Sequence, residues 1–549
     1  MASLQKRTVK GIDYWSLVES KRINGKPRPV VIEYFGNTKN FAKKLEMLLN
    51  GESKIIKSYS HGDTYALMKI AERLGLEQIL DRAFKPQSRS GLTRSRSLLL
   101  IALQSICNPS SKSGFESWIK STTMPYDYNI PADDLNSNHF WEQMENITVE
   151  ELAKAESAIV QKIFKTYGFE LEKIVLDYTN YFSYISSSNI KSELAKRGHN
   201  KQKRNDLRQY SLALITTKES GLPLYSHIYE GNKNDKSVFP EYLEILKERI
   251  PNYDPKAITM IFDGGSNTKE NFEKLETHYV CSFSLNSCKE LYDIDLSEYN
   301  DIQLKNCIVR GFRTTHNIWG VERECILTYS PSLYTGQVKE LDKDICTAIE
   351  AFRELNEKLE NPKSRIKKDE SPIKSKIKKI LSAKHMDFIF ETSIIFDANG
   401  KCARVEHSVV ESAKEAIKYK FFGKKLLITD QQSWTTSEII QAYREQDCIE
   451  KIFRSTKNHE HCSIRPQYHF TDQKIRVHIF CCLLGLTLAT VLHQEITDRG
   501  FNASKYSILD ILHSIRRCWL KDSDSNRVTK VLEVMDDTQS SLWNIVQSL

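Results

Sequence analysis

From about residue 171 the chain alternates short apolar runs with polar turns, a pattern that predicts a β-sheet. Several runs are rich in β-branched residues and apolar at nearly every position, as in strands that are buried on both faces. Apolar residues at helical spacing interrupt the strands, so the predicted order is a meander, a helix and a new buried strand. The predicted strands are residues 174–177, 210–216, 224–229, 258–263, 279–285 and 425–430, and the predicted helices are residues 237–249, 267–275 and 436–457.

The rest of the chain differs from this pattern. The N-terminal part is mostly helical in pattern after a short, basic, strand-like start, and the end of the chain is also helical. A long stretch in the middle holds strand-like pieces, a charged helical span and a Lys-rich run, and simple loops are rarely so long. We therefore predict an N-terminal domain (1–168), a core in two parts (169–285 and 425–502), an inserted α+β subdomain (286–424) and a helical C-terminal segment (503–549).

The composition is that of an ordinary globular protein of several domains. The chain has 549 residues, 40% hydrophobic and 27% charged, so it can bury a sizeable core. Its formal charge of +8 is compatible with an acidic polymer as a partner. Basic residues cluster at 363–379, where a solvated helix face is the favoured interpretation, and at 196–208, where contact with nucleic acid is favoured.

The cysteines and the apolar stretches indicate the cell compartment in which we expect the protein. The 12 cysteines include no Cys-x-x-Cys pair, which argues against a zinc ribbon or a thioredoxin-like site and favours reduced thiols in the cytoplasm. The first residues lack the apolar core of a signal peptide. The most apolar stretch, residues 479–492, is shorter than the roughly 18 residues of a membrane span. We expect a buried helix there and no membrane partner.

Three carboxylates stand where divalent-metal chemistry needs them. Asp177 and Asp263 each end an apolar, β-branched run, so each is predicted at the exposed end of a buried strand. Two such strands side by side would bring two hard oxygen ligands together, as Mg²⁺ requires. Glu450, in the helix predicted at 436–457, is the candidate third ligand. The combination favours metal-dependent phosphodiester chemistry.

The predicted helix at 436–457 carries a polar row. Tyr443, Gln446, Glu450 and Lys457 lie at offsets of zero, three, seven and fourteen, so they share one face of a continuous helix. Such a row suits a phosphate beside a metal ion, although a helical Glu with a nearby Lys is more often an ordinary surface pair. The residues that would dock the helix are Ile449, Ile452 and Phe453.

Other acidic and metal-ligating residues have simpler interpretations. Asp430 ends a predicted strand but more simply caps the next turn, and Asp447 lies in less favourable surroundings than Glu450. The run His459-Glu460-His461-Cys462 matches no standard zinc spacing and is interpreted as a polar helix end.

Motifs in a fixed order run along most of the chain, and in this order they resemble the DDE transposases of bacterial insertion sequences, in the Tn5-like superfamily with an insertion before the final Glu. The resemblance covers roughly residues 14–492. In the family's helix signature, Tyr443, Glu450 and Lys457 match, and Gln446 stands where Arg is usual. The other motifs are Asp177-Tyr178-Thr179 with Phe182; Gly198-His199-Asn200-Lys201 with Arg204, Asp206-Leu207 and Gln209; Gly221-Leu222-Pro223-Leu224; Gly231-Asn232 with Asp235; Asp263-Gly264-Gly265; and Ile464-Arg465-Pro466 with His469 and His478.

The resemblance implies an RNase H-like α/β core, with Asp177 on the first strand, Asp263 on the fourth and Glu450 on a helix. It implies two Mg²⁺ ions about 3.5–4 Å apart, with Mn²⁺ able to substitute, bridged by Asp177 and Asp263 and with Glu450 on one of them. The residues implied to contact DNA or its phosphates are Tyr443, Gln446, Lys457, Lys201, Arg204 and Arg465.

The resemblance also implies a function and partners. The protein would bind the terminal inverted repeats of an insertion sequence, cleave the ends and join the 3′-OH ends to target DNA, as a homodimer on double-stranded DNA at the bacterial nucleoid. Two alternatives stay open: a catalytically inactive, regulatory DNA-binding relative, and an RNase H-like nuclease that cuts without joining strands.

Overall fold

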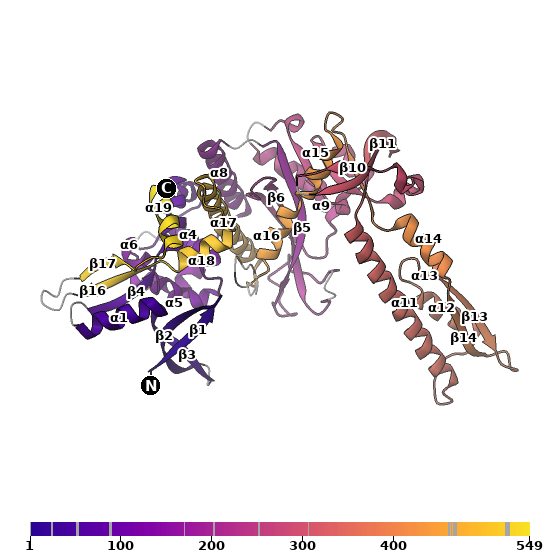
Figure 1. The fold of residues 1–549 in the computed structure, drawn as a ribbon, viewed down its shortest axis with the longest axis horizontal. Coiled ribbons are helices and arrows are strands. Elements are labelled where there is room, and N and C mark those ends of the chain that lie inside the picture. The colour runs from indigo at the N-terminus through magenta and orange to yellow at the C-terminus, as the bar shows by residue number, and fades with distance from the viewer. Residues whose placement is uncertain are drawn as a thin grey trace. The chain divides into compact units, whose positions relative to one another are not determined.

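The computed structural model divides the chain into two compact units, Met1–Ile258 with Gln446–Leu549 (unit 1), and Thr259–Glu445 (unit 2) (Figure 1). The structure describes residues 2–23, 26–50, 54–86, 91–168, 171–200, 204–250, 253–305, 307–458, 460, 462, 464, 469–521 and 528–549.

Unit 1 begins with an antiparallel sheet of order β1-β2-β3, a larger strand region than the short strand-like start that the sequence predicts. A second small sheet joins the two ends of the chain, because β16 pairs with both β17 and β4. The sequence predicts only helices after residue 503, so this hairpin is a correction. The elements are β1 (Ala2–Val9), β2 (Ile12–Ile23), β3 (Lys26–Asn37), α1 (Thr38–Asn50), β4 (Lys54–Ser60), α18 (Lys505–His513), β16 (Arg516–Lys521), β17 (Val528–Leu532) and α19 (Asp537–Ser548).

A helical layer follows β4, as the sequence predicts for this region. Its longest member, α8, starts at a capping box of Thr148 and Glu151 and ends at Gly168, whose φ of 67° suits glycine. The helices are α2 (Gly62–Arg73), α3 (Leu76–Ala83), α4 (Arg94–Cys107), α5 (Phe115–Lys120), α6 (Met124–Asp127), α7 (Ser137–Gln143) and α8 (Val149–Tyr167).

Helix α17 (Asp472–Asp498) is apolar around its whole circumference and packs against α2, α4 and α8. Its approach to α4 is close, since a Cβ at Gly485 would lie 2.4 Å from the carbonyl oxygen of Ala102. By length and composition this helix is able to cross a membrane, but 89% of its most apolar window is buried in the protein, as in a core helix.

The first chain segment of unit 1, which runs to Ile258, ends with an antiparallel meander of β5, β6 and β7 followed by α9, as the sequence predicts. Asp177 lies within β5, whereas the sequence predicts that the strand ends there. The pairing with β6 continues to Ser183, because polar residues beyond Asp177 still find backbone partners. The bounds are β5 (Lys173–Ser183), β6 (Arg208–Thr217), β7 (Pro223–Glu230) and α9 (Asp235–Arg249).

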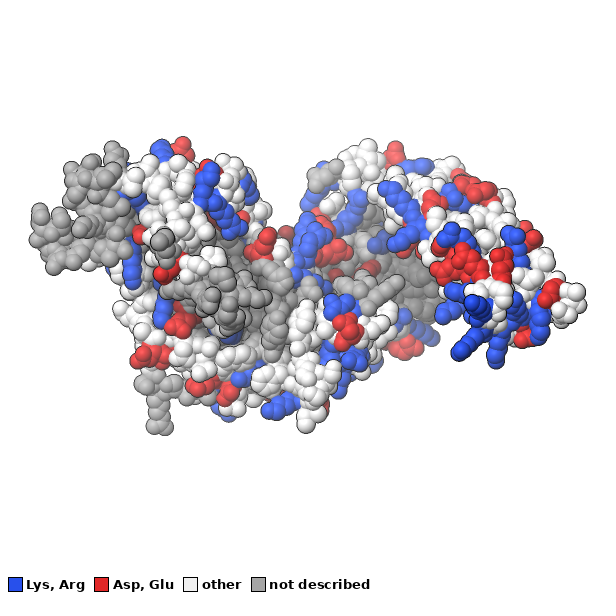
Figure 2. Space-filling model, turned by 90° about the horizontal axis from the view of Figure 1, so that it is seen from below, with Lys and Arg blue, Asp and Glu red and all other residues white. Residues whose placement is uncertain are grey.

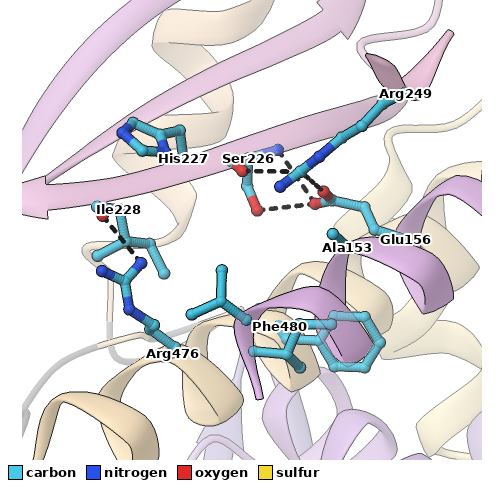
Figure 3. Close-up of a pocket in the computed structure, with 10 residues that line it drawn as sticks. Ala153, Glu156, Ser226, His227, Ile228, Arg249, Arg476 and Phe480 are labelled. Atoms are coloured by element: carbon cyan, nitrogen blue, oxygen red, sulfur yellow. Dashed lines mark hydrogen bonds and ion pairs between the residues drawn. The ribbon is translucent and has the colours of Figure 1, made fainter. Parts of the chain in front are cut away.

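A partly buried ion pair ties α8 to this meander beside a cavity of about 40 Å³ (Figure 3). Arg249 Nη1 donates to Glu156 Oε2 at 2.6 Å, and the backbone N–H and hydroxyl of Ser226 donate to Glu156 Oε1 at 3.0 and 2.7 Å. Burial raises the pKa of the Glu156 carboxyl to about 7, against the opposing charge of Arg249.

This raised pKa predicts a pH dependence of stability. Below the ordinary Glu pKa of 4.5 the carboxyl is protonated in both the folded and the unfolded states. Between about pH 4.5 and 7 the unfolded state is ionised while the folded carboxyl stays protonated, so the free energy of unfolding falls by up to about 3 kcal/mol as the pH rises to the folded pKa of about 7. Glu156→Gln is expected to remove this fall, measured by urea denaturation at pH 5 and pH 8. Glu244→Gln, at an exposed position of α9, should change nothing. Equal pH slopes in wild type and Glu156→Gln would contradict the prediction.

Unit 2 contains a mixed sheet of order β10-β11-β12-β15-β9-β8, in which β8 and β9 are parallel and the other pairs antiparallel. The strand-like pieces predicted near residues 306–310 and 324–329 belong to this sheet; Asn306 lies outside the described residues. The elements are β8 (Thr259–Phe262), α10 (Lys269–Lys274), β9 (His278–Phe283), β10 (Asn300–Gln303), β11 (Ile308–Ile318), β12 (Val321–Tyr329), β15 (Lys424–Thr429) and α15 (Thr436–Arg444).

Along the chain, the residues between β12 and β15 form a hydrophobic core of their own, within the predicted insertion. Helix α11 carries Leu341, Ile345, Phe352 and Leu359 along one face, and that face packs on α12 and β14 (Figure 1). The insertion therefore has its own core, although the predicted five-part division of the chain stays a prediction. Its elements are α11 (Pro331–Glu360), α12 (Glu370–Ile380), α13 (Met386–Ile389), β13 (Phe390–Phe396), β14 (Cys402–Val409) and α14 (Glu411–Phe421).

Lys and Arg side chains gather over part of the insertion (Figure 2). On α12, Ile373 and Ile377 are buried, and the lysines between and after them are exposed. Lys374 pairs with Glu370 at 2.6 Å. This is the solvated helix face that the sequence predicts for residues 363–379.

Candidate active site

The Asp263 side of the candidate site belongs to unit 2. The buried strand β8 ends at Phe262, and Asp263 follows it directly, as the sequence predicts. The parallel register pairs Phe262 with Cys281 on β9, so Asp263 lies beside the next residue of β9, Ser282. Ser282 Oγ donates a short hydrogen bond to Asp263 Oδ1, and the backbone N–H of Gly264 donates to Ser282 Oγ at 2.9 Å.

Helix α15 and strand β15 complete this group of side chains. Tyr443, on α15, donates its hydroxyl proton to Asp263 Oδ1 at 3.0 Å. Lys425, on β15, donates from Nζ to the Tyr443 hydroxyl at 2.7 Å and lies 4.3 Å from the centre of the Tyr443 ring. We call Asp263, Ser282, Tyr443 and Lys425 the Asp263 cluster.

The electrostatics of this cluster favour an ionised carboxylate. Desolvation acts to raise the pKa of Asp263, but the hydrogen bond from Ser282, the adjacent backbone N–H of Gly264 and the charge of Lys425 outweigh it, so the pKa is lowered. Burial and the negative charge of Asp263 raise the pKa of Tyr443, so its phenol stays protonated as a donor. The arrangement holds a charged carboxylate oxygen in one orientation.

The other candidate ligands belong to unit 1. Asp177, Thr179 and Tyr181 alternate along β5 and therefore share one face of the strand. Lys457 Nζ donates a short hydrogen bond to Thr179 Oγ1 and lies 5.4 Å from the centre of the Tyr181 ring. The hydroxyls of Tyr181 and Thr456 are 2.6 Å apart. These contacts fix the chain just after α16 to the face of β5 that carries Asp177.

Glu450 lies on α16 (Asp447–Ser455), which packs against β5, and its side chain is exposed. Ile449, Ile452 and Phe453 are buried, which confirms the predicted apolar stripe of this helix. The helix thus docks through its apolar side and presents Glu450 to solvent.

The continuous helix predicted at 436–457 is wrong. Helix α15 ends at Arg444 and α16 begins at Asp447. Between them, Glu445 has ψ near −6°, and the N–H of Ile449 bonds to the carbonyl of Gln446 in the tighter pattern of a 3₁₀ turn. Tyr443 and Glu450 therefore lie on different helices and not on one continuous face.

Of the four remaining residues that are predicted to contact DNA, two lie within the described part of the chain. Gln446 is only 7% exposed, and Arg204 forms a two-pronged ion pair with Asp206, both bonds at 2.8 Å. Lys201 and Arg465 lie outside the described residues. The phosphate contacts assigned to these four residues stay predictions.

Several motif residues have a packing role that the sequence does not reveal. A Cβ at Gly198 would lie 2.1 Å from the carbonyl oxygen of Gly231, and a Cβ at Gly231 would lie 2.0 Å from that of Gln209. The Gln209 side chain donates to the carbonyls of His199 and Gly231 at 3.1 and 2.7 Å. These glycines allow two chain segments to approach closely.

The sequence predicts that Asp430 caps the following turn, but its carboxylate has other partners. It accepts from the backbone N–H of Tyr279 and contacts His278 Nδ1, both at 2.9 Å. In the His459–Cys462 run, both histidines lie outside the described residues, and Cys462 is buried with its thiol directed at the carbonyl of Cys482.

The structure thus brings Tyr443 to Asp263 in one unit and Lys457 to the Asp177 face of β5 in the other. Among the residues that the structure describes, no group of three His, Cys, Asp or Glu side chains lies close enough to hold a metal ion. Ser282 and Lys425 also belong to the Asp263 cluster, but the sequence predicts no role for them, and the only local signal is that each is a polar residue within a predicted strand.

The sequence pattern of the family described as "Transposase DDE domain" matches residues 186–488, more than half of the chain. The chain belongs to the DDE transposase family. Its functions are therefore DNA binding, DNA recombination and transposition. The mixed sheets and the helices of the structure confirm the predicted α/β class, and the RNase H-like topology stays a prediction.

Two solved structures are similar to parts of the chain. A piggyBac transposase synaptic complex with hairpin DNA matches 76% of this chain and 69% of that chain, at 7% identity and a TM-score of 0.36. A Mos1 transposase paired-end complex with the left transposon end matches 35% and 59%, at 13% identity and a TM-score of 0.14. Both scores are below 0.5. No curated protein matches the sequence.

Proposed function

We propose that this protein is the transposase of a bacterial insertion sequence of the Tn5-like superfamily, which binds the terminal inverted repeats, cleaves the ends and joins the 3′-OH ends to target DNA. The observation that carries the proposal is the Asp263 cluster, in which an ionised carboxylate directly after a buried strand is held by two hydroxyl donors. Such a carboxylate, in a chain of the DDE family, is best explained as a metal ligand.

The proposed site is made of Asp177, Asp263 and Glu450. DDE transposases generally use divalent metal ions, and the oxygen-only donor set fits Mg²⁺ or Mn²⁺ better than zinc, which favours Cys and His. Two such ions would activate a water or a 3′-hydroxyl and stabilise the leaving oxygen. Both bonds from the Asp263 cluster reach Oδ1 of Asp263, so Oδ2 is the oxygen better placed to serve as a ligand.

The residues around these carboxylates have proposed roles in gripping DNA. Lys457 follows α16, which carries Glu450, and its ammonium group is suited to a phosphate next to the metal site. Tyr443, Gln446, Lys201, Arg204 and Arg465 are proposed to contact DNA, and the ion pair of Arg204 with Asp206 would have to open for direct contact. A homodimer is proposed for the complex in which two element ends are paired.

One assay separates the proposal from its alternatives. Purified protein is incubated with Mg²⁺, labelled element ends and a circular target DNA, and cleaved and joined products are resolved on a gel. The proposal expects both products, and neither from Asp177→Ala. Cleavage without joining would favour an RNase H-like nuclease, binding without cleavage a regulatory DNA-binding relative, and full activity of Asp177→Ala would refute the site assignment.

A further inference from the structure

Two residues outside the proposed carboxylate triad are linked to Asp263 by hydrogen bonds. Ser282 contacts Asp263 directly, and Lys425 contacts it through Tyr443. We propose that Ser282 and Lys425 are positioning residues that fix the orientation of the Asp263 carboxylate, Ser282 directly and Lys425 through Tyr443. This inference rests on the proposed function, because it assigns their role to the metal-binding step of that same site.

The sheet delivers both side chains to one face. Ser282 on β9 pairs with Leu427 on the antiparallel strand β15, and Lys425 lies two residues before Leu427. Since side chains alternate along a strand, Ser282 and Lys425 project from the same face. The neighbouring Lys424 projects the other way and is buried, with its ammonium group donating to the carbonyl of Tyr292 at 2.9 Å. One lysine of the pair is thus structural, and the other faces the Asp263 cluster.

The hydrogen bonds of Ser282 leave its hydroxyl little choice of orientation. Its side chain is 7% exposed, and a buried hydroxyl without partners is costly. The oxygen accepts from the N–H of Gly264, and the proton goes to Asp263 Oδ1. The serine therefore holds one carboxylate oxygen in place.

Lys425 sets the direction of the second bond. An ammonium group has three donors and no acceptor, so the Tyr443 oxygen that accepts a hydrogen bond from Lys425 must direct its own O–H elsewhere. That proton is directed at Asp263 Oδ1, at 3.0 Å. Without Lys425, the Tyr443 oxygen loses the partner that fixes the direction of its O–H, so the second donor to the carboxylate is held less firmly.

Positioning and simple charge predict opposite effects on metal binding. A lysine that acted only as a nearby positive charge would repel a cation, so its removal would tighten Mn²⁺ binding. A positioning residue behaves in the other direction, because groups that orient a metal ligand typically contribute 10- to 100-fold in affinity. The sign of the change therefore identifies the role.

The experiment titrates the full-length protein with Mn²⁺ alone, without DNA, and follows free Mn²⁺ by electron paramagnetic resonance. Asp263→Asn defines the binding that depends on Asp263. Ser282→Ala and Lys425→Met are each expected to weaken that binding about 10-fold, and Lys425→Arg to restore part of it. Lys343→Met, an exposed lysine on α11, is the matched control. Circular dichroism melting checks that each variant is folded.

A double-variant cycle tests the route through Tyr443. If Lys425 acts through the tyrosine, Lys425→Met in a Tyr443→Phe background should weaken Mn²⁺ binding no further, whereas independent roles would add. Unchanged or tighter binding in Ser282→Ala and Lys425→Met, with binding lost in Asp263→Asn, would overturn the inference and leave the proposed function standing. Wild-type binding in Asp263→Asn would instead overturn the metal role of Asp263 and this inference with it. Since Ser282→Ala does not touch the lysine, a folding defect in one variant leaves the other decisive.

Discussion

Asp263→Asn is expected to lower the rate of metal-dependent cleavage of element ends by about 10³-fold, on the scale of losing one electrostatic stabiliser of a transition state. The substitution keeps the size of the side chain and its ability to accept from Ser282, but it removes the negative charge that a divalent ion needs. Affinity for the DNA end should change by less than about threefold, or 0.7 kcal/mol. Cleavage of labelled ends and gel-shift titration measure the two quantities.

Asp430→Asn is the matched control for this prediction. Asp430 follows β15 as Asp263 follows β8, and both strands belong to the same sheet. The carboxylate of Asp430, however, is used by the backbone N–H of Tyr279 and by His278, and an Asn oxygen can still accept the backbone bond. Cleavage should stay near the wild-type rate. Equal losses in the two variants would mean that Asp263 has a structural role only.

The central elements could be predicted because their pattern is local. Strands such as β6 and β8 are buried at almost every position, and buried strands show as unbroken apolar runs in the sequence. The helix predicted at 237–249 likewise matches α9 (Asp235–Arg249) to within two residues. These signals depend on a few neighbouring residues and need no knowledge of the tertiary structure.

Elements that depend on distant partners could not be predicted. Strand β16 pairs with β4, more than 450 residues earlier in the chain, and no local pattern announces that pairing. The break between α15 and α16 involves no Pro or Gly, so the sequence favours one continuous helix. The strand-like pieces near residues 306–310 and 324–329 are predicted within the insertion, because the sequence does not show that β12 pairs with β15.

The candidate site follows the same division. Asp263 could be identified because it ends an apolar run, and Tyr443 because a family signature contains it. Ser282 and Lys425 could not, since their contact with the Asp263 cluster depends on the register of β8, β9 and β15. A strand shifted by one residue would turn each of these side chains to the opposite face. The register, and not the identity of the residues, places them in the site.

Glu450→Gln is expected to lower cleavage by about 10²- to 10³-fold and to leave the fold intact. The side chain is exposed on α16, which is docked on β5 by the buried Ile449, Ile452 and Phe453, so the amide should fit without strain. What changes is the charge of the proposed third ligand, and a neutral amide is a much weaker ligand for a divalent ion than a carboxylate. Thermal unfolding and end cleavage in Mg²⁺ measure the two effects.

Asp447→Asn provides the contrast on the same helix. Asp447 is exposed and pairs with Lys451 at 2.6 Å. Such a surface ion pair typically contributes less than about 1 kcal/mol to stability. The two acidic residues lie three positions apart on α16. If cleavage depended only on the negative charge of this helix, both substitutions would lower the cleavage rate. If Glu450 is a metal ligand, only Glu450→Gln lowers it. Cleavage near the wild-type rate in Asp447→Asn, with the loss confined to Glu450→Gln, is the expected result. Comparable rates in the two variants would remove Glu450 from the proposed site.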